Sequence, residues 1–188
     1  MEKKGGSFLI EESNFKDIFI IEDFDETSRQ MLEATREFVA KEISPKVREL
    51  ENHNYDLVAD IMKKAGQLGL LGLNIPEEYG GFGMGFNLSM LICGEMSADS
   101  GSVATAYGAH TGIGTYPILY YASEEVKKHF LPKIASGEWL SCYNLTEPNA
   151  GSDANAGKTI AILDEEQKNY ELTGQKIWIS NAGFAEVF

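Results

Sequence analysis

Glu147 is the residue whose type and setting most directly suggest chemistry. Pro148 follows it, and a residue that precedes proline is restricted to extended backbone conformations, so its carboxylate is held in a defined direction. A rigid carboxylate is a candidate general base. The same group can instead accept hydrogen bonds from backbone amides in its loop, and we favour this structural role for Glu147.

The loop that follows, residues 151–159 (GSDANAGKT), has the composition of a phosphate-binding loop. That motif needs glycine at position 152, where Ser152 stands, and it leads into a helix. Residues 159–164 (TIAILD) have the pattern of a strand instead. The glycines at 81, 83 and 85 also alternate and do not form the dinucleotide motif GxGxxG. We therefore expect no nucleotide site of either kind.

The histidines and cysteines do not fall at the spacing of metal ligands. His53, His110 and His129 are far apart in the chain, and no cysteines form a CxxC pair. We therefore expect structural or surface roles for the histidines and no bound metal. Cys93 and Cys142 give no disulfide framework either, which favours a reducing, cytoplasmic compartment.

Helical patterns occupy the part of the chain that precedes Glu147. Apolar residues recur at three- and four-residue spacing from Asp25 to Leu50. Thr27 and Gln30 fit a capping box at its start, and Pro45 is expected to kink or restart the helix. Further helices are predicted at residues 57–68, stopped by Gly69, at residues 88–96, and in the segment SEEVKKHFLPKIASGE, which Ser123 can cap.

After Gly137 the pattern changes to short runs rich in β-branched and aromatic residues, which predict strands at 139–145, 158–163, 170–173 and 176–180. Helices followed by strands indicate an α+β fold. We expect an all-helical domain at residues 1–137 and part of a β-domain at residues 138–188. Such a sheet would carry an uncovered edge, so we expect the chain to be a piece of a longer protein.

Charge and hydropathy exclude several classes of function. The chain has 188 residues, 16 basic and 29 acidic, and a net charge of −13, which argues against a nucleic-acid partner. Residues 1–15 contain acidic residues and no apolar run, unlike a secretory or mitochondrial signal. Residues 100–123 are uncharged, but Ser, Thr, Gly, His and Pro dilute their hydropathy, so we expect a buried helix and no membrane span.

Two motifs resemble the signatures of the flavin-dependent acyl-CoA dehydrogenases. Residues 143–153 (YNLTEPNAGSD) resemble the first, and residues 176–183 (KIWISNAG) resemble the second at the expected later position. The similarity extends through LGLLGLNIPEEYGGFG, YGAHTGIG and HFLPKIASGE, so it covers nearly the whole chain after about Asp23. YGAHTGIG and WISNAGFAEVF look most like the very-long-chain branch of the family.

The resemblance implies a set of cofactor contacts in the first motif. Leu145 and Thr146 are expected to hydrogen-bond the isoalloxazine ring of FAD. Gly151 and Ser152 are expected to meet the pyrophosphate, and Ser152 also to border the CoA moiety of the substrate. Tyr143 belongs to the same cofactor-binding set. Backbone amides and small hydroxyls suit this task, because the protein must hold and orient the flavin.

The second motif implies contacts with the flavin ring itself. Trp178 is expected to pack on the ring, although a core tryptophan in a strand is the alternative interpretation. Ser180 stands where the family often has threonine, whose hydroxyl faces flavin N5, and serine keeps that donor. Ile179 completes the cofactor-binding set. No catalytic residue is assigned.

The family resemblance also implies the activity. An acyl-CoA is oxidised to a trans-2-enoyl-CoA while hydride passes from the β-carbon to FAD, and an electron-transferring flavoprotein reoxidises the flavin. The glutamate base comes from a C-terminal helical bundle that this chain lacks, so we expect the chain alone to bind FAD weakly and to be inactive. A homo-oligomer is expected at full length. The alternatives are an acyl-CoA oxidase, a flavin monooxygenase, or a non-catalytic helical binding module.

The uncharged segment gains a possible role from this resemblance. Ala104, Gly108 and Gly112 recur every four residues and place small side chains on one helix face. Either a neighbouring helix packs closely there or a linear acyl chain does. We favour an acyl channel.

Overall fold

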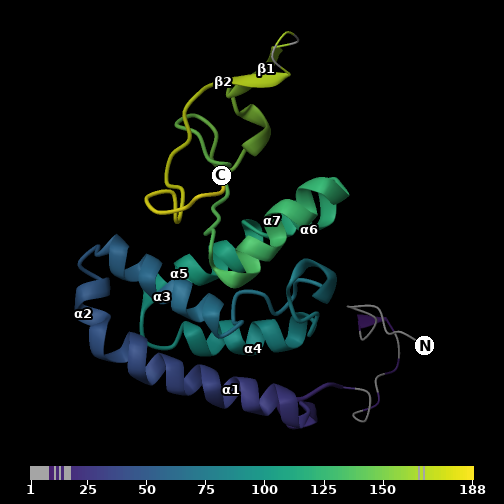
Figure 1. The fold of residues 1–188 in the computed structure, drawn as a ribbon, viewed down its shortest axis with the longest axis vertical. Coiled ribbons are helices and arrows are strands. Elements are labelled where there is room, and N and C mark those ends of the chain that lie inside the picture. The colour runs from purple at the N-terminus through teal and green to yellow at the C-terminus, as the bar shows by residue number, and fades with distance from the viewer. Residues whose placement is uncertain (1–8, 11, 13, 15–17, 165, 167) are drawn as a thin grey trace.

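The computed structural model describes residues 9, 10, 12, 14, 18–164, 166 and 168–188, so the expectation for residues 1–15 falls largely outside the described residues. Helices form the body of the molecule, and a hairpin of two strands projects from it on the side opposite α1 (Figure 1). The α-helices are α1 Glu26–Phe38, α2 Val47–Leu50, α3 Tyr55–Gln67, α4 Phe86–Met96, α5 Gly101–Gly108, α6 Tyr116–Tyr121 and α7 Glu124–Ser136. The strands are β1 Ile160–Asp164 and β2 Asn169–Thr173, which confirms the α+β order.

Helix α1 begins two residues earlier than a Thr27 cap would place it. The Asp25 side chain accepts a hydrogen bond from the Ser28 backbone N–H at 2.7 Å. The capping box predicted from Thr27 and Gln30 is therefore wrong, and the Gln30 amide contacts Glu26 instead. The negative charge of an acidic N-cap also interacts favourably with the positive end of the helix dipole.

Pro45 interrupts the first helical pattern as predicted. After α1 the chain makes a π-helical turn, Val39–Ile43, and then a 3-10 turn, Ser44–Lys46, before α2 begins. Proline lacks the N–H that a continuing helix needs, so the helix restarts rather than passing through. Ile43 is fully buried in this break and ties it to the core.

Helix α3 passes through the middle of the core. Asn54 caps it, accepting from Leu57 N–H at 3.0 Å, and Gly69 lies just beyond its end with φ +78°, a conformation that glycine adopts without strain. A Cβ atom on Gly66 would lie 2.3 Å from the Ser136 carbonyl oxygen, so glycine lets α3 approach the end of α7 closely. The predicted stop at Gly69 is confirmed.

The main core lies between α1, α3, α4 and α5. Ile61 and Met62 of α3 have no exposed area, and they share this core with fully buried residues of α4 and α5, namely Ile92, Met96, Val103 and Tyr107. The Tyr107 hydroxyl donates to the Leu70 carbonyl oxygen at 2.7 Å, which satisfies its one polar atom. A second cluster lines α7: Ile75, Tyr79, Leu131, Ile134 and Ala135.

The uncharged segment 100–123 is several elements rather than the one buried helix that was predicted. Helix α5 passes into a π-helical turn, Ala109–Ile113, and α6 begins afterwards with Pro117 in its first turn. No helix in the described part of the chain is long and apolar enough to cross a membrane. Added Cβ atoms on Gly108 and Gly112 would meet nothing within 4 Å, so no neighbouring helix packs against these glycines in the described structure.

The described β-structure is one antiparallel hairpin. Ile160 pairs with Thr173 and Leu163 with Tyr170, so strands predicted at 158–163 and 170–173 are present with small shifts. The strands predicted at 139–145 and 176–180 are wrong. Those segments are irregular apart from an isolated parallel bridge between Ser141 and Val187. A composition rich in β-branched and aromatic residues does not suffice for a strand when no neighbouring backbone completes the ladder.

Candidate functional site

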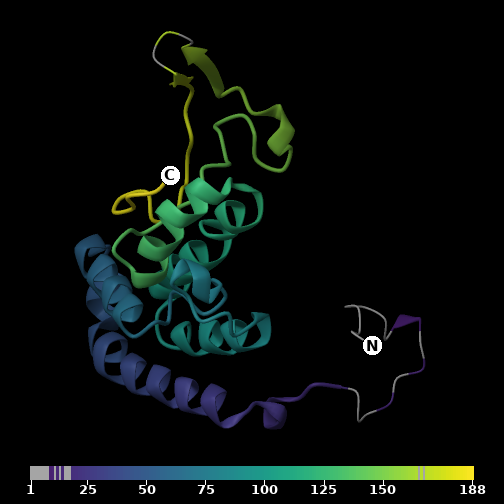
Figure 2. The same cartoon turned by 45° about the vertical axis from the view of Figure 1, so that its right-hand side comes forward.

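Two irregular segments, residues 143–152 and 176–181, carry the residues expected to bind the cofactor, and hydrogen bonds join them. The Ile177 N–H donates to the Thr146 carbonyl oxygen at 3.0 Å, and Lys176 Nζ donates to the Leu145 carbonyl oxygen at 2.9 Å. The C-terminal segment, yellow in Figure 2, returns from the hairpin to the helical body. Leu145 and Thr146 are thus brought beside the second motif, although 31 residues separate Leu145 from Lys176.

The Glu147 carboxylate lies at the centre of this junction. Its side chain is 7% exposed, and it accepts hydrogen bonds from the backbone N–H groups of Lys158 at 2.5 Å and Thr159 at 3.1 Å. Lys176 Nζ donates to the same carboxylate at 2.8 Å. A buried carboxylate needs this set of donors, because desolvation of an unpartnered charge is costly. The structural role favoured for Glu147 is confirmed.

Glu147 is unsuited to act as a base. The hydrogen bonds from Lys176 and Thr159 lower its pKa to about 2. A general base works best when its pKa lies near the working pH, so this carboxylate has little tendency to take a proton at neutral pH. The residue therefore organises its loop and does not abstract protons.

A tight turn follows Glu147 and leaves Gly151 and Ser152, the residues expected to meet the pyrophosphate, exposed to solvent. The backbone groups of Glu147 and Ala150 bond each other in both directions at 3.1 Å, with Ala150 buried below. Gly151 and Ser152 leave this turn with exposed side-chain positions. No hydrogen bond joins Gly151 or Ser152 to the second motif among the described residues. The structure therefore brings Leu145 and Thr146 to the second motif but leaves the Gly151–Ser152 corner apart.

Trp178 stands out from the surface of the second motif. Its side chain is 86% exposed, and its backbone has φ +55°, a left-handed value that is uncommon for a bulky residue. The interpretation of Trp178 as a core tryptophan is therefore wrong for the described structure. Ser180 and Ile179 are half-buried beside it. A large aromatic ring held outward from an irregular loop is available to stack on a planar partner.

Asn181 fixes the far side of the second motif against the helical body. It is buried, has φ +70°, and donates through Nδ2 to the Ala106 carbonyl oxygen at 2.9 Å and to the Ser141 carbonyl oxygen at 3.1 Å. Asparagine tolerates the left-handed conformation better than most residues. The Asn181 side chain thereby connects the loop that contains Trp178 to α5, through Ala106, and to the segment that precedes the first motif, through Ser141.

His110 forms the other half of this buried junction. Its Nδ1 accepts the Ser141 N–H at 3.0 Å, so Nε2 carries the hydrogen and donates to the Ile134 carbonyl oxygen at 3.1 Å. Burial lowers the pKa of His110 to about 4, although the bond to Ile134 and the charge of Glu186 oppose this shift. The ring is neutral at pH 7 and holds two structural hydrogen bonds, which confirms the structural role expected for it.

The first motif offers a row of free donors. The backbone N–H groups of Tyr143, Asn144, Leu145 and Thr146 bond no other group in the described part of the chain. Tyr143 and Leu145 are exposed, whereas Thr146 is half-buried. Unpaired amide donors near a surface call for water or a ligand, because backbone N–H groups are almost always satisfied. Amide donors beside an exposed indole fit a planar, polar-edged ring such as a flavin.

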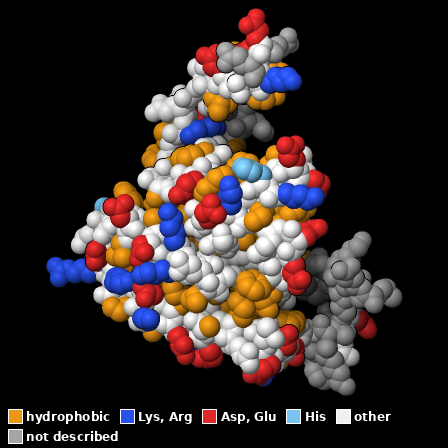
Figure 3. Space-filling view, viewed as in Figure 1, with side chains coloured by type: hydrophobic (Ala, Val, Ile, Leu, Met, Phe, Trp, Pro, Cys, Tyr) orange, Lys and Arg blue, Asp and Glu red, His pale blue; other side chains and the backbone are white. Residues whose placement is uncertain are grey.

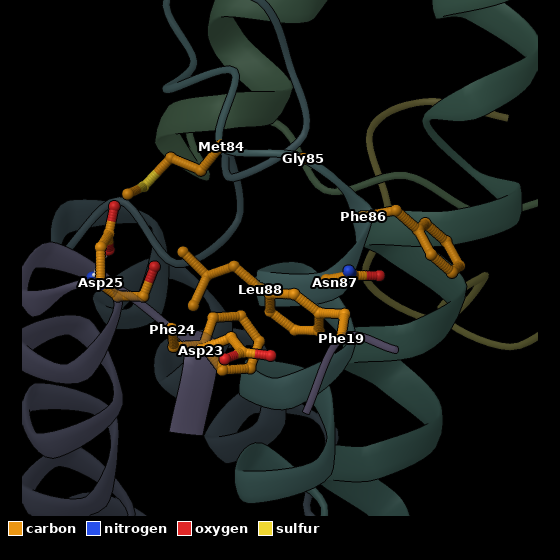
Figure 4. A pocket seen from close by; sticks show the side chains of 10 residues that line it. Phe19, Asp23, Phe24, Asp25, Met84, Gly85, Phe86, Asn87 and Leu88 are labelled. Atoms are coloured by element: carbon orange, nitrogen blue, oxygen red, sulfur yellow. Dashed lines mark hydrogen bonds between the residues drawn. The ribbon is translucent and has the colours of Figure 1, made fainter. Parts of the chain in front are cut away.

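One pocket includes a predicted site residue of the second motif, and another has no residue of either motif in its lining. A pocket of about 380 Å³ between α3, α5 and the C-terminal loop is lined by Ser180 and Asn181. A second, of about 410 Å³, lies between the chain that precedes α1 and the start of α4. Figure 4 shows Phe19, Phe24 and Leu88 gathered in this second pocket, with Phe86 pointing away. None of its lining residues was predicted to bind cofactor.

Other surfaces offer less specific chemistry. Among the described residues, no group of three His, Cys, Asp or Glu side chains is placed to hold a metal ion. Hydrophobic side chains gather over α4 on the face shown in Figure 3. Two residues of α4 have large exposed fractions, 59% for Phe86 and 45% for Met90. Acidic and basic side chains are interspersed elsewhere on this face.

Comparison with known proteins agrees with both motifs. The acyl-CoA dehydrogenase N-terminal domain matches residues 25–138, and the acyl-CoA dehydrogenase middle domain matches residues 142–188. This chain belongs to the acyl-CoA dehydrogenase family. The resemblance seen in the sequence is therefore confirmed at the level of the family.

Members of the family resemble this chain along nearly its whole length. A probable acyl-CoA dehydrogenase of Bacillus subtilis is 45% identical over 99% of the chain, which spans 31% of that relative. An acyl-CoA dehydrogenase of Bacillus anthracis, solved in complex with FAD, superposes with a TM-score of 0.92 and 44% identity over 98% of this chain and 31% of its own. A chain in the structure of the electron transferring flavoprotein of Acidaminococcus fermentans has a TM-score of 0.81 and 32% identity over 88% of this chain and 43% of its own.

Lys176 and Asn181 were not assigned roles from the sequence, and His110 was expected only to have a structural or surface role. Lys176 and Asn181 lie inside the second motif, so that motif could have drawn attention to them. Their partners, however, are backbone carbonyls and a carboxylate distant in sequence. No spacing rule within the chain predicts such contacts.

Proposed function

We propose that this chain forms the FAD-facing part of an acyl-CoA dehydrogenase that oxidises an acyl-CoA to a trans-2-enoyl-CoA. The observation that carries the proposal is the junction of the two motifs, where free backbone N–H groups of residues 143–146 lie beside the exposed Trp178 loop. The FAD-bound relative from Bacillus anthracis supports it. The division into a helical domain at 1–137 and a partial middle domain at 138–188 belongs to the same proposal.

The cofactor contacts follow from this placement. Leu145 and Thr146 supply hydrogen bonds to the edge of the flavin ring, and Tyr143 and Ile179 flank them. Trp178 covers one face of the ring and excludes water from it. Ser180 offers its hydroxyl, which bonds no other described group. Gly151 and Ser152 meet the pyrophosphate, and Ser152 also borders the CoA moiety.

The chemistry divides between the cofactor and the protein. Bound FAD would supply the acceptor for the hydride that leaves the β-carbon of the substrate. The described residues bind and orient the ring, and Glu147 does not serve as the base for the α-proton, since its pKa is lowered to about 2. We place that base in the part of the family fold beyond this chain.

The partners follow from the same proposal. The substrate is an acyl-CoA, an electron-transferring flavoprotein takes the electrons, and the longer protein forms a homo-oligomer. Acyl chain length is open, and membership of the very-long-chain branch stays a prediction. The free thiols of Cys93 and Cys142 suit a reducing compartment such as the cytoplasm.

FAD titration of the 188-residue chain tests the cofactor site, followed by flavin fluorescence. We expect weak, saturable binding that Trp178→Ala abolishes. Trp139→Phe is the matched control, because Trp139 packs on Phe130 and Lys133 of α7, away from both motifs. Equal loss in both variants, or none in either, contradicts the proposed site.

A chimera tests the reaction. This chain is joined to the remaining part of the Bacillus subtilis relative, of which it spans 31%. We expect the chimera to bind FAD and to reduce an artificial electron acceptor when acyl-CoA is added, whereas the chain alone is inactive. Faster turnover with oxygen than with the acceptor would favour an oxidase instead. A folded, yellow chimera that oxidises no acyl-CoA contradicts the proposed function.

A further inference from the structure

The two cofactor-facing segments lack regular secondary structure that would fix their relative position. Residues 143–147 and 176–180 contain no helix or strand. In the described structure their joining contacts are the bond from Ile177 N–H to the Thr146 carbonyl oxygen and two bonds from Lys176 Nζ. Lys176 therefore makes most of the connection through one side chain.

We propose that Lys176 is a positioning residue of the FAD site. Its ammonium group bonds the Leu145 carbonyl oxygen at 2.9 Å and the Glu147 carboxylate at 2.8 Å, and this holds the row of backbone donors against the Trp178 loop. The inference rests on the proposed function, because it assigns Lys176 a role toward the same FAD. Lys176 does not contact the cofactor itself in this assignment.

Burial makes the contact between Lys176 and Glu147 specific. The side chain of Lys176 is 27% exposed and that of Glu147 is 7% exposed, so water competes poorly for either charge. Without Lys176, the carboxylate retains only the backbone N–H groups of Lys158 and Thr159 as donors. An incompletely paired buried charge moves toward water, and the loop that contains it then moves as well.

The Trp178 backbone gives a second reason to expect a local effect. Its φ of +55° is uncommon for a large side chain, and such a conformation persists where the surroundings hold it. Lys176 and Ile177 hold the chain on one side of Trp178, and Asn181 holds it on the other. Loss of Lys176 releases one of these two sides.

Three substitutions distinguish a positioning role of Lys176 from the effect of removing any positive charge near Glu147. Lys176→Met removes the ammonium group, and Lys176→Arg restores a cation with several donors. Lys158→Met is the matched control: it makes the same change of residue and charge beside the same carboxylate. Lys158 contacts Glu147 through its backbone N–H, and its own side chain is exposed.

Native-state amide hydrogen exchange, read by NMR on the chain without FAD, gives the first measurement. The Ile177 N–H should lose at least tenfold protection in Lys176→Met, because its acceptor on Thr146 moves away. Amides of α3 should keep their protection, which a global loss of stability would not allow. Lys158→Met should leave Ile177 unchanged. Equal Ile177 protection in both methionine variants, or a parallel loss throughout α3, overturns the proposal.

The FAD dissociation constant of the same variants gives the second measurement. We expect Lys176→Met to weaken FAD binding at least tenfold, Lys176→Arg to recover most of the affinity, and Lys158→Met to stay within twofold of the wild type. Local loss of Ile177 protection with unchanged FAD affinity overturns the role toward FAD. If the wild-type chain itself fails to bind FAD, the proposed site fails, while the exchange measurement still decides whether Lys176 positions the two segments.

Discussion

The helical region, residues 25–138, and the second region, residues 142–188, are held together by different forces. The helical region contains nearly all of the buried apolar side chains, including Ile61 and Ile92 with no exposed area. In the second region every described residue of β2 is exposed, and its apolar core residues are few: Cys142, Ala150 and Val187. The helices therefore fold around an apolar core, whereas the second region depends on polar contacts at a few points.

Those contacts are made by Glu147 with Lys176, and by Asn181 and His110 with Ser141. Hydrogen bonds are directional, so they can fix the position of a loop. The hydrophobic effect has no direction and cannot fix a loop in this way. The comparison shows that polar contacts fix the loop positions in the region that has the fewest buried apolar side chains. Cofactor residues occupy that part.

The largest effect should come from a truncation in the core of the helical region. Ile61→Ala should lower the free energy of unfolding by about 2–5 kcal/mol, because it opens a cavity in a fully buried site. Leu172→Ala in β2, where the side chain is 72% exposed, should change it by less than about 0.5 kcal/mol. Urea denaturation followed by helical circular dichroism measures both. Comparable losses would mean that the two regions do not differ as described.

Acid should weaken the junction between the regions through His110. Its folded pKa of about 4 lies below the ordinary value of 6.5, so the unfolded chain binds the proton more readily. The free energy of unfolding should therefore fall as pH drops from 6.5 to 4, by up to about 1.4 kcal/mol per pH unit. Urea denaturation across this range gives the slope.

His110→Asn is the control for the titration of His110. This variant cannot titrate, and it should be less stable at pH 7, since the Ile134 carbonyl oxygen loses its partner. The difference in unfolding free energy between the wild type and the variant should narrow as pH falls toward 4. A constant difference would place the pH dependence on other groups.

A smaller effect should come from Asn181. Asn181→Gly keeps the left-handed backbone free of strain but removes the bonds to Ala106 and Ser141, and should cost about 1–2 kcal/mol. Asn155→Gly makes the same change at an exposed position and should cost less. Urea denaturation gives both costs, and exchange of the Cys142 N–H, which bonds Val187, shows whether the loss is local. If both variants behave alike, Asn181 does not anchor the loop.

Helix boundaries were the most predictable part of the fold. Ser123 and Gly69 mark a start and a stop in the sequence, and the structure uses both. These signals are local, because a cap satisfies backbone groups within the next turn. The predicted Thr27 capping box was wrong by only two residues, since the Asp25 side chain accepts the capping hydrogen bond instead.

The strands and the anchors were harder to predict because they depend on distant partners. Residues 176–180 have the β-branched and aromatic composition of a strand, yet their main backbone contact is the single bond from Ile177 to Thr146. The two motifs identified the family and the candidate cofactor residues. They did not reveal that Lys176 reaches back across 29 residues to Glu147, because such a contact exists only after the chain has folded.

The projecting hairpin affects how this chain behaves at high concentration. Within the described residues β1 and β2 pair with each other alone, so each has an outer edge with no neighbouring strand, flanked by exposed side chains such as Ile162 and Leu172. Edges of this kind join between copies. A net charge of −13 keeps the copies apart, and salt shortens the reach of that repulsion to about 8 Å at physiological ionic strength. Salt should therefore promote self-association here, so dilute, low-salt buffers are the natural choice for handling this chain.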